Sequence, residues 1–203
     1  MKMIVRNDRL AADLIRERQR LGIDKADEVW DGVYVMSPLA SITHQAIVST
    51  LTAALYEVVT EQQQGQVFPG ANVSDRNEDW EQNYRCPDLV VVCHGGRAID
   101  RGTHWQGGPD FLVEVMSPGD NTLAKIPFYA SIGVQELLVI DRDSREPSLY
   151  RLDKTELRPI TADPTDTSVA SQVVPLRFRR IDNAGRPVLE IARTDGPQKT
   201  WTV

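Results

Sequence analysis

The chain has 203 residues, of which 41% are hydrophobic and 26% charged, and its formal net charge is −6. This length suits one well-buried core, and the composition argues against disordered, collagenous and disulfide-stapled proteins. No apolar run approaches the roughly 18 residues of a membrane span, and the N-terminus lacks the apolar stretch of a signal peptide. Cys86 and Cys93 would point to opposite faces of one strand-like run and could not form a disulfide. We therefore expect reduced thiols, no membrane association and a cytoplasmic location.

The negative charge bears on function. Proteins that bind nucleic acid without sequence preference usually have a basic surface, because neutralising phosphates supplies most of their affinity. Contact with DNA would therefore depend on local basic patches or on metal ions between two sets of negative charges. Four arginines near the C-terminus have few acidic neighbours in the sequence: Arg177, Arg179, Arg180 and Arg186. They could contact a phosphate backbone or protect an edge strand from aggregation.

The first half of the chain alternates helical and strand patterns. Leucines at helical spacing predict a helix over Leu10–Leu21, and Asp-Gly between β-favouring residues predicts a hairpin over Val29–Met36. A long helix is expected over Ser41–Gln64, because its apolar residues recur every three or four positions. A strand over Gln66–Val73 and a polar loop over Ser74–Asn83 follow.

Three short apolar runs in the second half are typical of strands inside a sheet. Asp88–Cys93 and Phe111–Met116 are rich in β-branched residues and are joined by a glycine-rich connection, Gly95–Gly108. Leu137–Ile140 is the third run. We expect all three to be neighbours in one sheet.

The remaining elements are shorter. A helix is expected between Thr122 and Ile132, closed by Gly133, and Pro127 requires it to start late or to be kinked. Asp163–Ser171 has the composition of a surface loop. Val173–Arg179 predicts an edge strand, since it contains a proline.

This order of elements predicts an α/β (α+β) fold, a central mixed sheet flanked by helices with extra hairpins. No internal repeat or linker divides the sequence. We expect a single domain over residues 1–203, with an N-terminal helical extension (1–27), a core (28–150) and C-terminal strands and a tail (151–203).

Two carboxylates lie where the sequence is otherwise apolar. Glu114 lies inside Phe111–Met116, and Asp88 begins the neighbouring run. Burying an ionised carboxylate without a partner is costly, so each should be paired, protonated or bound to metal. Two such groups on adjacent strands can bind one hard cation, whereas the competing interpretation pairs Glu114 with a buried Arg or Lys and makes Asp88 a loop cap. Asp110 is a weak third candidate, because four residues of strand separate it from Glu114 by roughly 13 Å.

An ordered set of short motifs supports the first interpretation. It runs through Asp31-Gly32, Met36-Ser37-Pro38, His44, Pro87-Asp88, Pro109-Asp110, Glu114, Ser117-Pro118, Lys125, Tyr129, Gly133-Val134, Glu136 and Asp141. Over roughly residues 28–150 this set resembles the Uma-type family of restriction-endonuclease-like proteins. That family belongs to the PD-(D/E)XK nuclease superfamily, which uses Mg²⁺ for phosphodiester hydrolysis. The resemblance implies a restriction-endonuclease-like fold and a Mg²⁺- or Mn²⁺-dependent nuclease acting on DNA.

The resemblance also implies a site. Asp88 and Glu114 match the two acidic metal ligands of the superfamily, with the carbonyl of Val115 as a further ligand. The superfamily lysine would stand at Met116, but the Uma-type pattern has its lysine on the following helix, where this sequence has Lys125. Lys125 would then orient the attacking water or stabilise the phosphate. Lys125 and Tyr129, four residues apart, share one face of a regular helix.

Other interpretations remain open from the sequence. Lys125 could be a solvated helix residue, and His44 a packed core histidine rather than a site residue. Glu28 matches a family position but follows an ordinary solvated segment. The alternative functions are a non-catalytic interaction module, favoured by the acidic charge and by Met116, and a metal-dependent hydrolase of a smaller substrate. We expect a homodimer, the commonest assembly.

Overall fold

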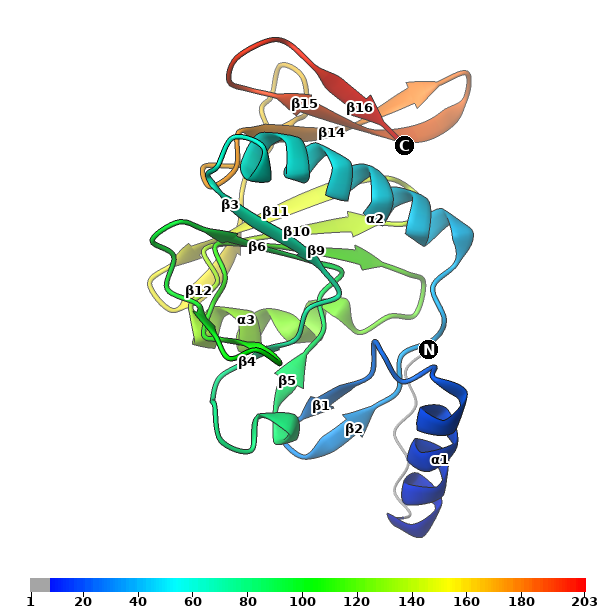
Figure 1. Cartoon of the computed structure of the whole chain (residues 1–203). Coiled ribbons are helices and arrows are strands. Elements are labelled where there is room, and N and C mark those ends of the chain that lie inside the picture. Colours follow the sequence, from blue (N-terminus) through cyan, green and yellow to red (C-terminus); the bar gives the residue numbers. More distant parts are fainter. Residues whose placement is uncertain (1–7) are drawn as a thin grey trace.

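The computed structural model describes residues 8–203 and contains both helices and sheets in stacked layers. Its helices are α1 (Asp8–Leu21), α2 (Ile42–Leu55) and α3 (Ile126–Ile132). The core sheet has the order β12-β11-β10-β9-β6-β3, with the bounds Glu156–Pro159, Pro147–Asp153, Glu136–Asp141, Phe111–Met116, Leu89–Cys93 and Gly65–Pro69. α2 lies on one side of this sheet and α3 on the other (Figure 1). The expected mixed α and β fold is confirmed.

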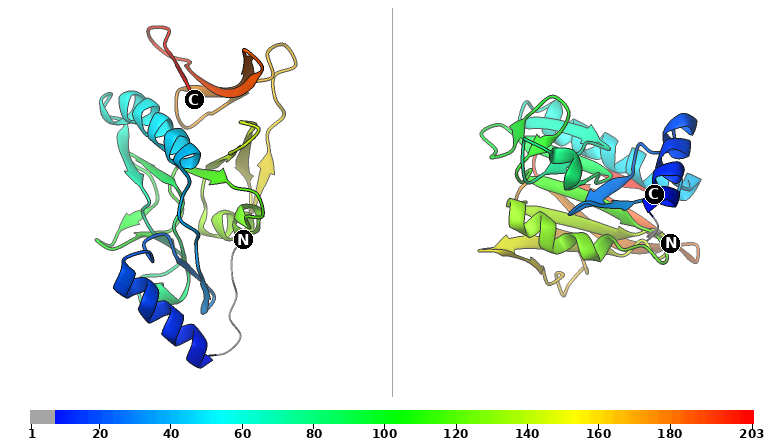
Figure 2. Two further views of the ribbon diagram at one scale, coloured as in Figure 1. Left: turned by 90° about the vertical axis from the view of Figure 1, so that its right-hand side faces the viewer. Right: turned by 90° about the horizontal axis from the view of Figure 1, so that it is seen from below.

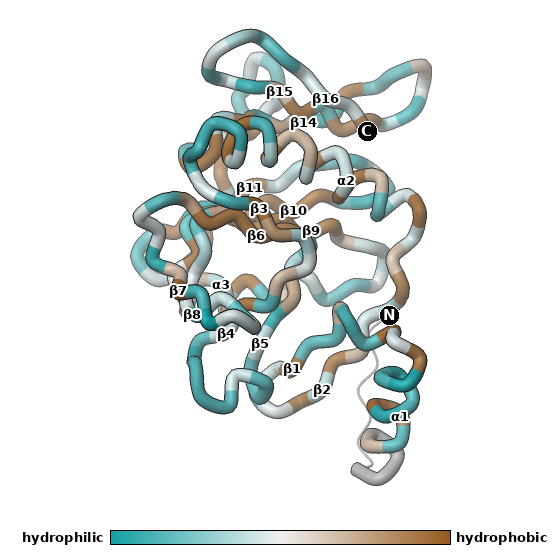
Figure 3. Tube along the Cα trace, viewed as in Figure 1, coloured by the Kyte–Doolittle hydropathy of each residue, from teal (hydrophilic) through white to brown (hydrophobic). Residues whose placement is uncertain are grey.

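The three apolar runs form neighbouring strands at the centre of the core sheet, as expected. β9 is parallel to β10 and antiparallel to β6. Their hydrophobic residues lie in brown segments at the middle of the molecule (Figure 3). β-branched and leucine side chains fill both faces here, which explains why these runs are continuously apolar rather than alternating.

α2 begins as predicted and ends earlier. Ser41 caps it, and its Oγ accepts a hydrogen bond from the backbone N–H of His44 at 3.1 Å. Ile47 and Leu51 are fully buried on its inner face. The predicted end at Gln64 is wrong, because the helix gives way to one π-helical turn, Tyr56–Thr60.

A second, accessory sheet is built from short strands. Its order is β2-β1-β5-β4-β8-β7, with the bounds Val33–Val35, Glu28–Trp30, Tyr84–Arg85, Val73–Ser74, Trp105–Gln106 and Ile99–Asp100. The hairpin of β1 and β2 confirms the Asp-Gly prediction: Asp31 and Gly32 both have positive φ, 48° and 80°, as a type I′ turn requires.

One prediction for this region is wrong. The single strand over Gln66–Val73 is two strands of different sheets, because Pro69 ends β3 and Gly70 turns with φ 62°. The connection Gly95–Gly108 contains β7 and β8, which pair with each other and so extend the accessory sheet. A strand of two residues is too short to show the alternation of apolar and polar residues by which strands are recognised in a sequence.

The short helix confirms the expectation from Pro127. A 3₁₀ turn, Thr122–Lys125, comes first, and α3 begins at Ile126 with the proline in its first turn, where its missing N–H costs no hydrogen bond. Gly133 closes the helix with φ 88°. A further 3₁₀ turn, Trp80–Gln82, lies in the predicted polar loop.

The C-terminal residues form a four-stranded sheet with the order β13-β14-β15-β16 and the bounds Val169–Ala170, Leu176–Asn183, Arg186–Arg193 and Thr200–Thr202. The edge strand expected at Val173–Arg179 is wrong, since β14 starts after Pro175 and lies between two partners. The surface loop expected at Asp163–Ser171 is wrong at its end, because it includes β13. This sheet lies over α2 at the opposite end of the molecule from α1 (Figures 1 and 2).

Several arginines of the C-terminal sheet are paired with acids. Arg177 contacts Asp166 at 2.7 Å and Arg179 contacts Glu190 at 2.7 Å. With Arg180, which contacts Asp182 at 3.2 Å, these pairs engage three of the four arginines that the sequence suggested as a basic patch. Cys86 and Cys93 are both free, as expected. None of the helices in residues 8–203 has the length and apolar character that crossing a membrane requires.

Candidate active site

The strand register brings Asp88 and Glu114 together. Leu89 of β6 is paired with Val113 of β9, so one position further outward Asp88 faces Glu114. Directly opposed residues of antiparallel strands point to the same face, with Cβ atoms about 5 Å apart. The backbone N–H of Val115 donates to Asp88 Oδ2 at 2.7 Å and fixes that carboxylate.

Glu114 is buried and has two donors from the next helical segment. Lys125 Nζ donates to Glu114 Oε1 at 2.7 Å, and the Tyr129 hydroxyl donates to the same oxygen at 2.5 Å. Both donors bind Oε1, so within residues 8–203 Oε2 remains for another ligand. The sequence alternative of a buried cation beside Glu114 is therefore observed, whereas a solvated Lys125 is wrong, because only 4% of that residue is exposed.

Glu28 reaches the same place from the accessory sheet. Its Oε1 lies 2.6 Å from Lys125 Nζ, and only 1% of the residue is exposed. Sequence reasoning missed this contact because the segment before Glu28 looks solvated. The hairpin could have indicated it. The Asp-Gly turn pairs Glu28 with Val35, an apolar residue that points inward, so Glu28 should point inward too.

His44 contacts Asp88, so the interpretation as a packed core residue is incomplete. From the first turn of α2, its Nε2 lies 2.9 Å from Asp88 Oδ1. Burial opposes the charged imidazolium, but the hydrogen bond and charge of Asp88, with the charges of Glu114 and Asp120, outweigh burial and raise the pKa of His44. The histidine therefore holds a proton more strongly than an ordinary one.

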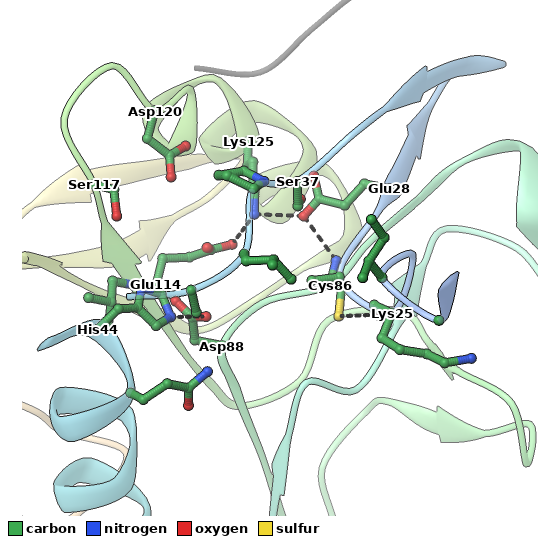
Figure 4. Close-up of a pocket in the computed structure, with 18 residues that line it drawn as sticks. Lys25, Glu28, Ser37, His44, Cys86, Asp88, Glu114, Ser117, Asp120 and Lys125 are labelled. Carbon is green, nitrogen blue, oxygen red and sulfur yellow. Dashed lines mark hydrogen bonds and ion pairs between the residues drawn. The ribbon is translucent and has the colours of Figure 1, made fainter. Parts of the chain in front are cut away.

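These side chains line one cavity of about 260 Å³ (Figure 4). Its lining includes Glu28, His44, Asp88, Glu114, Val115, Ser117, Asp120 and Lys125, with Lys25 at the border. Asp120 was not a sequence candidate. Its Oδ1 is buried and has no hydrogen-bond partner among the described residues.

Negative charge exceeds positive charge in this cavity. Among the described residues that line the cavity, Glu28, Asp88, Glu114 and Asp120 are acids, whereas Lys125 is the one buried lysine or arginine. Burial raises the pKa of Glu114 above its ordinary value, against the opposing effect of Lys125. Burial alone would lower the pKa of Lys125, but the charges of Glu114 and Glu28 outweigh burial and hold that pKa above the usual range.

The carboxylate oxygens of the cavity suit a hard divalent cation. Mg²⁺ is typically bound by one or two carboxylates and keeps several waters, so the pair Asp88 and Glu114 is a sufficient protein contribution. The unpartnered Oδ1 of Asp120 is an acceptor that a metal-bound water could satisfy. Residues 8–203 contain no cluster of three or more His, Cys, Asp or Glu side chains arranged to hold a metal by themselves. A cation here would need water or substrate oxygens as well.

Asp110 lies away from these residues. It precedes β9 at the opposite end from Glu114, where its Oδ2 accepts a hydrogen bond from the backbone N–H of Cys93 at 2.8 Å and its Oδ1 one from Gln135. Its carboxylate therefore joins strand ends, in agreement with the expectation from strand length.

Comparisons with known proteins identify the fold and the family. A crystal structure of a putative nuclease belonging to DUF820 from Anabaena variabilis ATCC 29413 has a similar fold, with a TM-score of 0.58 and 21% identity over 73% of this chain and 82% of that one. No curated protein matches the chain. A model of the Uma2 family, described as a putative restriction endonuclease, matches residues 18–184. The fold is thus restriction-endonuclease-like, the family's description supports a nuclease function, and the protein belongs to the Uma2 family.

Proposed function

We propose that this protein is a Mg²⁺- or Mn²⁺-dependent endonuclease that acts on DNA. The observation that carries the proposal is the convergence of Asp88, Glu114 and Lys125, from two strands and the following helical turn, in one acidic cavity. In this proposal Asp88, Glu114 and the carbonyl of Val115 hold the cation. The cation supplies charge stabilisation for the phosphate and an activated water.

The protein side chains have separate tasks in this proposal. Lys125 keeps its proton and directs its ammonium toward the phosphate or the attacking water, where charge develops. Tyr129 holds Glu114 in place through Oε1, which would leave Oε2 to bind the cation. His44 fixes Asp88 from the other side and adds a positive charge when protonated.

The acidic charge of the protein requires an explanation if DNA is the substrate. Among the described residues the cavity is bordered by one exposed lysine, Lys25, whose side chain is 85% exposed. Phosphate contacts by lysine and arginine are therefore few, and the divalent cation contributes a large share of the attraction. Binding should fall less steeply with added salt than it does for a protein with many phosphate contacts.

A non-catalytic interaction module is the second candidate. Met116 replaces the lysine of the superfamily pattern on β9, and Lys125 is engaged by two carboxylates. On this hypothesis the buried network is structural, so no divalent cation binds at Asp88 and Glu114.

A cleavage screen tests the proposal. Single-stranded, duplex and branched DNA are incubated with the protein and Mg²⁺ or Mn²⁺, and the control is the same protein with Glu114→Gln. We expect metal-dependent cleavage of at least one substrate, reduced by about a hundredfold or more in the variant. Equal cleavage by both proteins indicates a contaminating nuclease, and cleavage by neither, together with no metal binding, supports the interaction module.

A further inference from the structure

Glu28 lies beside Lys125 although it belongs to a different sheet from Glu114. It is on β1 of the accessory sheet, and its Oε1 is 2.6 Å from Lys125 Nζ. Glu114 lies 2.7 Å from the same ammonium. Lys125 is thus held between two carboxylates, one from each sheet (Figure 4).

Glu28 is itself held in one orientation. The indole N–H of Trp30 donates to its Oε2 at 2.7 Å, and the backbone N–H of Cys86 donates to its Oε1 at 3.1 Å. Both oxygens therefore have donors apart from the lysine. A buried carboxylate with this many partners keeps one rotamer and so presents a fixed acceptor to Lys125.

Arg85 fixes the accessory sheet against the helix that follows Lys125. Its guanidinium lies over the ring of Trp30 at 4.6 Å and over the ring of Phe128, on α3, at 4.1 Å. It also donates to the carbonyl oxygen of Val29 at 2.9 Å. β1 and α3 are thereby clamped together, and Glu28 and Lys125 with them.

We infer that Glu28 is a positioning residue that holds the ammonium of Lys125 between the two sheets, so that the lysine does not pair with Glu114 alone. A lysine side chain is long and has many rotamers, and one anchor would leave it free to move along the cavity wall. If Lys125 formed an ion pair with Glu114 alone, its positive charge would also cancel the negative charge that Glu114 contributes to cation binding. This inference rests on the proposed function for its catalytic consequence, whereas the positioning of the lysine can be measured without metal.

The first experiment measures that positioning in EDTA. Native protein is treated briefly with an acetylating reagent, and the acetylation of each lysine is quantified by mass spectrometry. In Glu28→Gln the acetylation rate of Lys125 should rise by about tenfold, because losing one charge-assisted hydrogen bond changes an equilibrium by about this factor. The rate of exposed Lys25 should stay constant. The matched control is Glu136→Gln, another glutamate with 1% exposure and an ion pair, to Arg151 at 2.7 Å, outside this cavity. An unchanged Lys125 rate in Glu28→Gln, or an equal rise in both variants, overturns the inference.

The second experiment asks whether Glu28 acts through Lys125. Single-turnover cleavage is measured at saturating metal for the wild type, Glu28→Gln, Lys125→Gln and the double variant. Positioning predicts a loss of about a hundredfold in Glu28→Gln and no further loss when it is added to Lys125→Gln. Glu136→Gln should cleave at the wild-type rate. An additive loss in the double variant, with weaker metal binding, overturns the inference, because Glu28 would then act directly on the cation.

Trp30→Phe is the second variant, for use if Glu28→Gln does not fold. It keeps an aromatic ring beside Arg85 and removes the N–H that orients Glu28. The acetylation rate of Lys125 should rise in the same direction by a smaller factor, and a wild-type rate overturns the inference. If no DNA is cleaved and no metal binds, the proposed function fails, whereas the acetylation result still decides whether Glu28 holds Lys125.

Discussion

The charged residues of the cavity differ in their environments. One oxygen of the buried Glu114 accepts hydrogen bonds from both Lys125 and Tyr129. Each oxygen of Asp88 has its own partner, His44 for Oδ1 and the Val115 N–H for Oδ2. Lys125 has two carboxylates as partners. A mutation at any of these positions therefore changes both the charge of the cavity and the pairing of its neighbours.

The first prediction concerns metal binding. Mg²⁺ or Mn²⁺ should raise the melting temperature of the wild type, because an ion that binds only the native state stabilises it. Glu114→Gln should abolish this rise, since it removes a ligand charge at nearly constant shape. Differential scanning calorimetry with and without metal measures the rise, and Glu136→Gln should keep it. An identical rise in Glu114→Gln means that the ion binds elsewhere.

The second prediction concerns Lys125→Ala. Leaving Glu28 and Glu114 buried without their cation should lower the free energy of unfolding by about 3–5 kcal/mol. Cleavage should fall by about a hundred- to a thousandfold, while metal affinity is retained or rises because a repelling charge is gone. Lys125→Arg should not restore the rate fully, since the guanidinium is bulkier and planar.

Rates for these variants must be compared at a temperature where each is folded, with metal titrated to saturation. Single-turnover cleavage of the substrate found in the screen is the measurement. A wild-type rate in folded Lys125→Ala removes this residue from the mechanism.

At the scale of elements, the site depends on how a few segments meet. β6 and β9 bring the two carboxylates opposite each other, and the 3₁₀ turn before α3 delivers the lysine. The far end of α3 is packed against the connection that leads into β9. There Gly108 approaches the backbone so closely that a Cβ atom would lie 2.2 Å from the carbonyl carbon of Gly133.

The third prediction follows from this approach. Gly108→Ala should push α3 away from β9 and lower the free energy of unfolding by about 3 kcal/mol, because neither backbone can move aside cheaply. The control is Gly102→Ala, where φ is 80° but no atom lies within 4 Å of the added Cβ, so that only about 1 kcal/mol of backbone strain is expected. Urea unfolding measures both. Equal losses in the two variants contradict the close-packing argument.

At the scale of the whole molecule, α2 joins two sheets. Its buried side chains belong to one hydrophobic cluster with residues of the core sheet and of the C-terminal sheet. Phe178 of β14 is fully buried and stacks on Phe111 of β9, with ring centroids 6.3 Å apart. The C-terminal sheet therefore shares its core with the strands that carry the site.

The fourth prediction is that Phe178→Ala destabilises the whole described structure. The lost ring and the remaining cavity should lower the free energy of unfolding by about 3–5 kcal/mol, in one cooperative transition. Ile99→Ala, at a residue that is 48% exposed, should change it by less than about 0.5 kcal/mol. Circular dichroism during urea unfolding is the measurement, and two separate transitions would contradict a shared core.

The fifth prediction concerns assembly. We expect a homodimer, since two-fold dimers are the commonest oligomers. Leu39 and Ile42, beside the start of α2, are 77% and 90% exposed and are candidates for burial between copies. Sedimentation equilibrium should give twice the chain mass of 22.8 kDa. A mass of one chain at all concentrations contradicts the dimer.

The sequence by itself determined the elements with strong local patterns. Continuous apolar runs rich in β-branched residues predicted β6, β9 and β10, Asp-Gly predicted the hairpin, and Pro127 with Gly133 predicted the bounds of α3. The convergence of Asp88 and Glu114 was also predicted from the sequence, because each lies in or beside an apolar run and needs a partner there. The order of motifs identified the family that the comparison then confirmed.

Only the tertiary structure decided the rest of the site. Strands of two residues have no detectable period, and strands β14 to β16 are recognised by the partners they find rather than by their own pattern. Glu28 and Asp120 lie in segments that look solvated; the hairpin register indicates only that Glu28 points inward, and no local pattern distinguishes Asp120 from a surface acid. Their place beside Lys125 and in the cavity depends on contacts between residues up to 97 positions apart, which a local pattern does not encode.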